Sequence, residues 1–283
     1  MAGGAPFQAA ILQVNASTDM QANIDQACAL TRAARDVGAD LVLMPENVAM
    51  MEWGRANITG KARTEAEHPA LAAFQDLARE TGLWLHCGTL AITLEGEDRI
   101  ANRTYVLDPK GEIQARYDKI HMFDVDLGGG ERYRESATFR PGEQAVTADL
   151  PWGTLGLSVC YDLRFPHLFR DLGKAGADFL TIPAAFTQKT GMAHWHVLLR
   201  ARAIETGCWV FAPAQTGSHA NDRKTYGHAL IIDPWGAVVA DAGEEPGFQI
   251  AQIDPAACAE ARGMVPALTH DRPYGFADKT AVG

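Results

Sequence analysis

The segment TLGLSVCYDLRFPHLFRDLGK, residues 154–174, contains the pattern that decides the fold class. Its first part alternates, because Leu155, Leu157 and Val159 share one face while the residues between them share the other. This alternation predicts a half-buried strand. Residues 165–174 then have the pattern of a helix. A strand that turns sharply into a helix is the repeating unit of α/β proteins.

Short apolar strands and helices also alternate on both sides of this segment. The pattern predicts strands at residues 7–14, 40–44, 83–87, 178–182 and 208–213, and helices at residues 23–37, 69–80 and 193–205. Strands interleaved with helices indicate α/β layers around a common core.

Two turns of sequence D-P-x-G interrupt this alternation. Residues 108–111 (DPKG) and 233–236 (DPWG) each lie between two strand-like runs. Proline suits the second position of a type I turn and glycine the fourth, so each turn predicts an antiparallel hairpin. The sheet should therefore be mixed. The recurrence of the turn also suggests two related halves.

The composition limits the classes of function. The chain has 283 residues, 47% of them hydrophobic, without a break in composition, so we expect one domain spanning residues 1–283. A formal net charge of -10 argues against a nucleic-acid partner and an anionic membrane surface. The five cysteines include no CxxC pair, which argues against a disulfide framework and a zinc ribbon. The N-terminus has no basic signal region and no run is long enough to span a membrane, so a cytoplasmic protein is expected.

Cys160 is the first candidate for chemistry. It ends the alternating strand before a turn, where a side chain faces outward and backbone N–H groups can bind an oxyanion. A free cysteine can equally be a small buried apolar residue, and Cys160 alone does not decide between the two.

Glu46 and Lys119 are two further candidates at strand ends. Glu46 follows a buried run and a proline, where burial would raise its pKa toward values suited to a general base. Lys119 ends a hairpin strand, where it could hold an oxyanion or lower the pKa of a thiol. Taken singly, Glu46 could be a solvated loop residue and Lys119 a surface lysine on an edge strand.

Three segments together are more specific than these residues taken singly. MPEN, YDKIHMFDVD and SVCYDLRFP occur in this order around Glu46, Lys119 and Cys160. They resemble the three catalytic motifs of the carbon–nitrogen hydrolase (nitrilase-like) family. The resemblance continues through ERYRESATFRPGE (131–143), PAAFTQKTGMAHWHVLLRARAIE (183–205) and YGHALIIDPWG (226–236), and so covers nearly the whole chain.

The resemblance implies a fold and a mechanism. It implies a four-layer α-β-β-α sandwich whose subunits pack through helical faces into a homodimer or a larger homo-oligomer. It also implies a catalytic triad in which Cys160 is the nucleophile and Glu46 the general base. Lys119 and the backbone N–H of Tyr161 would stabilise the oxyanion, and Glu135 would support Lys119 or the substrate. No metal and no cofactor are implied.

The resemblance also implies a small amide substrate. The segments DLRFP, TGMAHW and LLRARAIE resemble the branch of the family that hydrolyses deaminated glutathione to 2-oxoglutarate and Cys-Gly. Omega-amidase activity on 2-oxoglutaramate, nitrilase activity and N-carbamoyl amine hydrolysis are the alternatives. A non-catalytic interaction protein on the same scaffold is a further alternative, against which the intact triad argues.

Two positions near these motifs raise separate questions. Arg164 could bind a substrate carboxylate through its planar guanidinium, or could form an ion pair that fixes the turn. His196 stands where related sequences commonly have glutamate, which matters only if this position lines the pocket. His194 and His196 form an HxH pair, but two such residues on a helix point in different directions, so no metal site is expected.

Overall fold

The computed structural model describes residues 4–128 and 130–276. Its helices are α1 (Met20–Asp36), α2 (Arg55–Lys61), α3 (Pro69–Thr81), α4 (Pro166–Lys174), α5 (Gln188–Thr206) and α6 (Ala256–Met264), with short 3-10 helices that include η2 (Glu135–Ala137), η3 (Cys160–Arg164) and η4 (Ala220–Asp222). Its strands are β1 (Phe7–Val14), β2 (Leu41–Leu43), β3 (Trp84–His86), β4 (Leu90–Ile92), β5 (Ala101–Leu107), β6 (Ile113–Asp118), β7 (Asp124–Asp126), β8 (Arg132–Arg134), β9 (Thr147–Leu150), β10 (Gly153–Leu157), β11 (Phe179–Thr181), β12 (Trp209–Ala212), β13 (Ala214–Ser218), β14 (Lys224–Tyr226), β15 (Leu230–Ile232), β16 (Val238–Asp241) and β17 (Gly247–Ile253).

The strands form two large sheets. The first has the order β14-β13-β1-β2-β3-β5-β4, with β17 paired to β1 and β6 paired to β5. The second has the order β16-β15-β12-β11-β10-β9. Both are mixed, as the two D-P-x-G turns predicted, because β5 and β6 form one antiparallel hairpin and β15 and β16 form another. Strands β7 and β8 form a separate hairpin.

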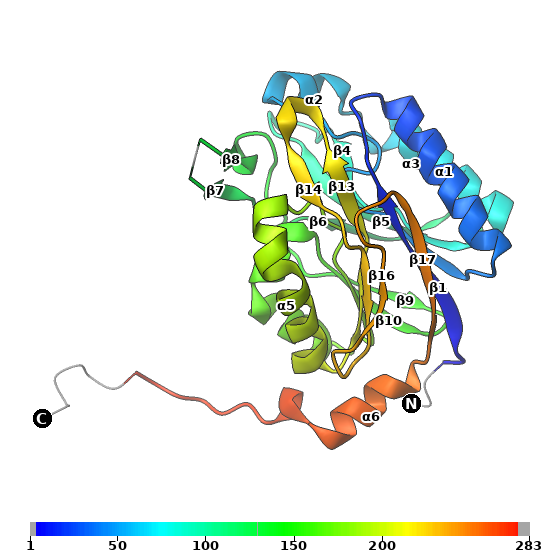
Figure 1. Ribbon diagram of the computed structural model, residues 1–283, viewed down its shortest axis with the longest axis vertical. Coiled ribbons are helices and arrows are strands. Elements are labelled where there is room, and N and C mark those ends of the chain that lie inside the picture. Colours follow the sequence, from blue (N-terminus) through cyan, green and yellow to red (C-terminus); the bar gives the residue numbers. More distant parts are fainter. Residues whose placement is uncertain (1–3, 129, 277–283) are drawn as a thin grey trace, which may run out of the picture.

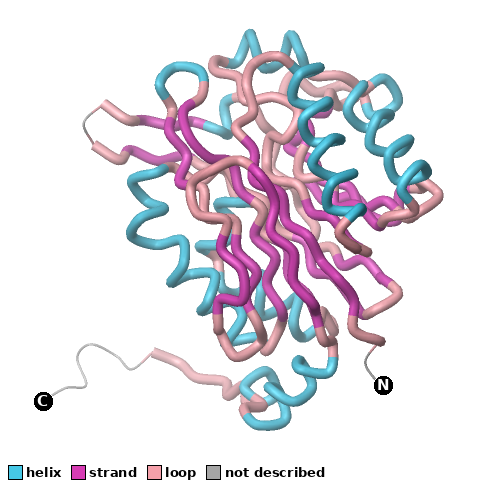
Figure 2. The backbone as a smooth tube through the Cα atoms, turned by 45° about the vertical axis from the view of Figure 1, so that its right-hand side comes forward, coloured by secondary structure: helices cyan, strands magenta, loops and turns pink. Residues whose placement is uncertain are grey.

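The two sheets stack between two layers of helices, which gives the α-β-β-α sandwich that the resemblance implied (Figures 1 and 2). Alternate residues of β1 show the layering. Phe7 and Ile11 belong to the apolar core between the two sheets, whereas Leu12 and Val14 belong to the core beneath α1 and α3. On the opposite side, α4 packs on β10 and α5 packs on β12. No helix in residues 4–128 and 130–276 has the length and apolar character that crossing a membrane requires.

The two sheets have the same order of pairing in their central parts. In the first, β1, β2 and β3 are parallel and are followed by the antiparallel pair β3–β5 and the β5–β6 hairpin. In the second, β10, β11 and β12 are parallel and are followed by the antiparallel pair β12–β15 and the β15–β16 hairpin. The two related halves that the recurring turn suggested are therefore present in the topology.

The halves are also joined through β1. This strand pairs with β2 on one side, and with β17 and β13 from the end of the chain on the other. Only Pro213 separates β12, in the second sheet, from β13, in the first. The sequence did not predict this crossing or the strands β13, β14 and β17.

Candidate active site

Cys160 lies in a sharp turn between β10 and α4. It is the first residue of η3 and has a φ of 48°, in the left-handed region that is costly for a residue with a side chain. The sequence predicted a turn that presents this residue, and the backbone has that form. Tyr161 follows in the first turn of η3, where N–H groups have no partner inside a helix. Its N–H is therefore suited to bind an oxyanion.

Asp162 holds the turn in place and was missed by the sequence analysis. Its side chain is fully buried, and one carboxylate oxygen accepts hydrogen bonds from the N–H of Val159 at 2.8 Å and from the hydroxyl of Tyr117 at 2.7 Å. The other oxygen accepts the N–H of His121 at 3.0 Å. Because Tyr117 and His121 flank Lys119, Asp162 fixes the segment that carries the lysine relative to the turn that carries Cys160.

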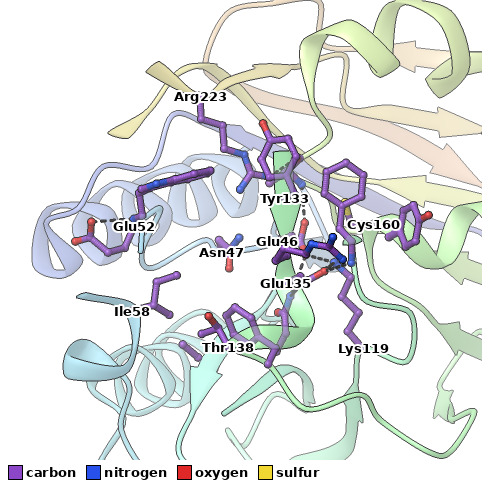
Figure 3. A pocket seen from close by; sticks show the side chains of 18 of the residues that line it. Glu46, Asn47, Glu52, Ile58, Lys119, Tyr133, Glu135, Thr138, Cys160 and Arg223 are labelled. Atoms are coloured by element: carbon purple, nitrogen blue, oxygen red, sulfur yellow. Dashed lines mark hydrogen bonds and ion pairs between the residues drawn. The ribbon is translucent and has the colours of Figure 1, made fainter. Parts of the chain in front are cut away.

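Glu46, Lys119 and Glu135 form a buried charged group beside this turn (Figure 3). The Lys119 ammonium donates to one oxygen of Glu46 at 2.9 Å and to both oxygens of Glu135 at 2.9 Å. Only 2% of the Lys119 side chain and 4% of the Glu46 side chain are exposed. The structure thus brings together, around Cys160, side chains from the segment after β2, the residue after β6 and the start of η2, which are far apart in the sequence.

Neutral groups complete the contacts of Glu46. The Asn102 side-chain amide donates to Oε1 at 3.0 Å, and the backbone N–H of Ala185 donates to Oε2 at 2.9 Å. The side chain of Gln215 donates to the Glu46 carbonyl at 3.0 Å. No sequence signal marks these three residues, because none of them differs in type from the polar and small residues of ordinary strand ends.

Glycine is required at one position close to Glu46. Gly88 has a φ of 57°, and a Cβ atom there would lie 2.0 Å from the carbonyl oxygen of Pro45. Only a residue without a side chain allows the turn after β3 to approach the segment that carries Glu46.

The pKa directions correct two expectations from the sequence. Burial alone would raise the pKa of Glu46, but Lys119, together with hydrogen bonds from Cys160 and the N–H of Ala185, outweighs this effect and holds the pKa below its ordinary value. Burial, followed by the Glu46 carboxylate, raises the pKa of the Cys160 thiol well above its ordinary value, and Lys119 offsets this only in part. Burial alone would lower the pKa of Lys119, but Glu135 and Glu46 raise it. The resting site therefore holds an ionised Glu46, a protonated Lys119 and a neutral thiol.

These side chains line a cavity of about 470 Å³. Tyr161 lines it too, and in Figure 3 Tyr133 and Arg223 lie at its upper side, away from Ile58 and Thr138. The lining contains more basic than acidic side chains. The basic ones are Lys119, Arg55, Arg132, Arg134 and Arg223, and the acidic ones are Glu46, Glu52 and Glu135. The cavity is thus locally basic in a chain of net charge -10.

Arg164, which the sequence put forward as an anion-binding residue, does not belong to this lining. Its guanidinium lies over the rings of Tyr161 and Phe186, at 5.8 and 5.2 Å from their centroids, and Nη1 is 3.3 Å from Nδ1 of His194. Arg164 thus packs behind two residues of the cavity wall, and within the described residues it forms no ion pair with a carboxylate.

His196 also lies outside the cavity lining, so the residue at this position does not shape the pocket. Its Nε2 is 3.2 Å from Asp241, whose carboxylate is also 2.9 Å from Nδ1 of His228. These three residues are the group of metal-type ligands that the described part of the chain brings together, within 4.8 Å. Hydrogen bonds to Asp241 account for the arrangement. His194 points elsewhere, toward Arg164, as expected for an HxH pair on a helix.

Comparison with known proteins identifies the family. The family model for carbon–nitrogen hydrolases matches residues 8–263. The chain belongs to the carbon–nitrogen hydrolase family. It is therefore a hydrolase that acts on carbon–nitrogen bonds, in agreement with the resemblance of its sequence motifs.

Individual carbon–nitrogen hydrolases support this assignment. A deaminated glutathione amidase of Synechocystis sp. is 43% identical over 270 residues, which are 94% of this chain and 98% of that protein. The crystal structure of the C. elegans NitFhit protein superposes with a TM-score of 0.88 and 35% identity, over 96% of this chain and 66% of the NitFhit chain. An amidase from Nesterenkonia sp. AN1, in a mutant with an acetamide moiety added covalently at its active site cysteine, superposes with a TM-score of 0.78 and 25% identity, over 92% of this chain and 94% of that one.

Proposed function

We propose that this chain is an amidase that hydrolyses deaminated glutathione to 2-oxoglutarate and Cys-Gly through a thioester on Cys160. The observation that carries the proposal is the convergence of Glu46, Lys119 and Cys160 on one cavity. The identity to a relative that acts on deaminated glutathione supports the choice of substrate.

The first step is attack by sulfur on the amide carbon. Because the resting thiol is neutral and Glu46 is ionised, Glu46 accepts the proton of Cys160 while the carbon–sulfur bond forms. The carbonyl oxygen becomes an oxyanion. The Lys119 ammonium and the backbone N–H of Tyr161 donate hydrogen bonds to this oxygen and stabilise it.

The second step is collapse of the tetrahedral intermediate. Glu46 gives its proton to the leaving nitrogen, the carbon–nitrogen bond breaks, and Cys-Gly departs from the thioester on Cys160. Water then gives a proton to Glu46 and attacks the thioester carbon. The carbon–sulfur bond breaks, the Cys160 sulfur regains the proton, and 2-oxoglutarate leaves.

Glu135 is assigned a positioning role. Both of its oxygens accept hydrogen bonds from Lys119 at 2.9 Å, and one also accepts the N–H of Phe123 at 2.6 Å. Two carboxylates therefore keep the ammonium protonated and hold its direction. This arrangement supports the use of Lys119 as a hydrogen-bond donor rather than as a base.

The basic cavity lining supports a substrate that carries carboxylates. Arg55, Arg134 and Arg223 form no ion pair with a carboxylate within residues 4–128 and 130–276. Unpaired guanidinium groups can bind the carboxylates of deaminated glutathione by charge-assisted hydrogen bonds.

The function is tested with purified protein and four substrates: deaminated glutathione, 2-oxoglutaramate, a small nitrile and an N-carbamoyl amine. We expect the highest kcat/KM for deaminated glutathione, measured as release of 2-oxoglutarate, and no turnover by Cys160→Ala. A higher kcat/KM for any other substrate would overturn the choice of substrate. Turnover by Cys160→Ala would overturn the mechanism.

The remaining expectations from the sequence are part of the proposal: residues 1–283 form one folding unit, and the protein acts in the cytoplasm as a homo-oligomer. Exposed apolar side chains on α5, at Met192, Val197 and Ile204, support packing through this helix. Light scattering after size-exclusion chromatography should give at least twice the mass of the chain. A monomer at micromolar concentration would contradict this part of the proposal.

A further inference from the structure

A second cavity, of about 350 Å³, adjoins the one that contains Cys160. The two cavities share Trp53, Arg132, Tyr133 and Arg223 as lining residues, so they meet along a common wall. None of the proposed chemical steps uses a residue of the second cavity, and the volume of this cavity is large enough for part of a small molecule.

The lining of the second cavity contains more cations than carboxylates. The cations are Arg132, Lys189, Arg223 and Lys224, and the carboxylates are Glu131 and Asp222. Arg132 is paired with Asp126 at 2.7 Å, and Lys189 donates to a backbone carbonyl. Arg223 and Lys224, by contrast, form no ion pair within the described residues. Two neighbouring cations without a carboxylate partner at the wall of a cavity are suited to an anionic ligand.

Arg223 is held in a fixed orientation with hydrogen-bonding capacity left over. Its Nη2 donates to the carbonyl of Ala185 at 2.8 Å, and the guanidinium lies over the ring of Tyr133, 5.4 Å from its centroid. Its Nε is buried and makes no hydrogen bond within the described part of the chain. A buried donor without an acceptor is costly, which favours a bound ligand as the partner.

The backbone before Arg223 is strained in a way that fixes this orientation. Asn221 and Asp222 have φ values of 57° and 55°, both in the left-handed region. Two successive non-glycine residues in this region are uncommon, and such strain is concentrated at functional sites. The loop thereby turns Arg223 back toward the cavities.

Ala185 connects Arg223 to the reacting centre. Its N–H donates to Oε2 of Glu46 at 2.9 Å, and its carbonyl accepts from Arg223. Ala185 therefore lies between Glu46, which donates the proton to the leaving nitrogen, and the guanidinium of Arg223. A dipeptide attached through that nitrogen reaches roughly 7 Å when extended, enough to bring its terminal carboxylate to Arg223.

We infer that the second cavity is the binding site for the leaving group of the amide, and that Arg223 and Lys224 bind the carboxylate of a dipeptide leaving group. The inference rests on the proposed function and extends it to a substrate class: amides whose amine part is an anionic peptide. It also separates this substrate class from 2-oxoglutaramate, whose leaving group is ammonia and does not reach the second cavity.

The test compares substrates with the same acyl group and different leaving groups. KM and kcat are measured for deaminated glutathione, for its analogue with a carboxamide in place of the glycine carboxylate, and for 2-oxoglutaramate. In Arg223→Gln we expect KM for deaminated glutathione to rise at least about 10-fold more than KM for 2-oxoglutaramate, as for loss of a charge-assisted hydrogen bond. Lys224→Gln should show a smaller difference in the same direction. Lys110→Gln, in the exposed turn after β5, is the matched control.

The carboxamide analogue decides whether the carboxylate is recognised. Wild type should prefer the carboxylate over the carboxamide, and Arg223→Gln should lose most of this preference. Equal losses on all three substrates, or no preference in wild type, would overturn the inference. If wild type hydrolyses none of the substrates, the proposed function is wrong. The subsite is then judged by the thermal shift that Cys-Gly and its C-terminal amide produce in wild type and Arg223→Gln: equal shifts would reject it.

Discussion

The two halves of the molecule contain corresponding strands that are followed by different residues. Residues 40–47 (DLVLMPEN) and 178–185 (DFLTIPAA) both begin with aspartate, form a short parallel strand and have proline at the same place. Glu46 in the first half corresponds to Ala184 in the second. The first half thus supplies a carboxylate, and the second supplies the backbone N–H of Ala185 that binds it.

The corresponding strands β1 and β10 show why only the second half supplies a nucleophile. Ile11 of β1 pairs with Leu43 of β2, and Leu157 of β10 pairs with Thr181 of β11, at the same place in the two matching segments. Ile11 therefore corresponds to Leu157. Three residues further along each chain segment, Val14 corresponds to Cys160. Strand β1 continues through Val14, which is buried in the apolar core. Strand β10 stops at Leu157, and Cys160 turns into the cavity. The shared topology brings the strand ends together, and the early end of β10 places a nucleophile in the cavity.

The largest effect is expected from removing the carboxylate of the first half. Glu46→Gln keeps the shape of the side chain but cannot accept the thiol proton. We expect kcat to fall about 10²–10⁴-fold, the usual contribution of a general base. Glu80→Gln, which alters an exposed ion pair with Arg32, is the control and should retain the wild-type rate. If kcat of Glu46→Gln were within a few-fold of the wild-type value, the general base would not be the carboxylate of the first half.

The next effect is expected from the contact that joins the halves. In Asp162→Asn an amide nitrogen replaces one carboxylate oxygen. This nitrogen cannot accept the hydrogen bonds that the oxygen receives in the wild type. Each buried donor without an acceptor costs about 1–3 kcal/mol. Both the unfolding midpoint in urea and kcat should fall, because Cys160 and Lys119 lose their fixed separation. Asp171→Asn, on the exposed side of α4, should change neither quantity. A loss of stability without a loss of kcat would limit Asp162 to a structural role.

Much of the fold could be predicted from the sequence, because its signals are local. Strand 7–14 coincides with β1, and the helix at 69–80 is α3, which ends at Gly82 in the left-handed conformation. Helix α5 begins at Gln188 rather than at residue 193. The difference arises at Gly191, which weakens a helical pattern but is needed because a Cβ atom there would lie 2.3 Å from Tyr226.

Other features depend on contacts between distant segments and leave no local signal. The sequence placed Glu46, Lys119 and Cys160 at strand ends, and the family motifs grouped them. It could not give the direction of the Glu46 pKa, because that depends on the competition between burial and Lys119. Arg223 was missed for a similar reason: its position depends on two left-handed residues and a contact with Ala185.

A smaller effect is expected from Gly88→Ala, beside the segment that carries Glu46. Gly82 provides a matched control, because both glycines have positive φ but a Cβ atom at Gly82 would meet nothing within 4 Å. Gly82→Ala should cost about 1 kcal/mol of stability, for the left-handed conformation alone. Gly88→Ala should cost more than about 2 kcal/mol and also lower kcat, since Pro45 must move. Equal losses in both variants would mean that the close approach to Pro45 has no effect.

The smallest effect concerns acid stability, where the halves differ again. His86 in β3 occupies the place of Phe211 in β12. Burial lowers the pKa of His86 to about 3, and that of His68 to about 4. Because both folded pKa values lie below the unfolded value near 6.5, the stability these residues contribute is present above pH 6.5 and is lost as pH falls through the range from 6.5 toward 3–4.

Urea unfolding at pH 7 and pH 5.5 tests this expectation. Wild type should lose about 1 kcal/mol per buried histidine over this interval. His86→Gln should reduce that loss by half, whatever its own effect at pH 7. An unchanged pH dependence in His86→Gln would show that the acid sensitivity does not originate at this position of the first half.

The pairing of β1 has a consequence for synthesis. While the ribosome makes the chain, the side of β1 that later meets β13 and β17 stays uncovered until residues 247–253 have emerged. An unpaired strand edge can form hydrogen bonds with the strands of other nascent chains and so promotes aggregation. Gln215, which binds the backbone of Glu46, also emerges late. Hydrolytic activity should therefore begin only after residues 247–253 have left the ribosome, and chaperones that cover strand edges should increase the yield of active protein.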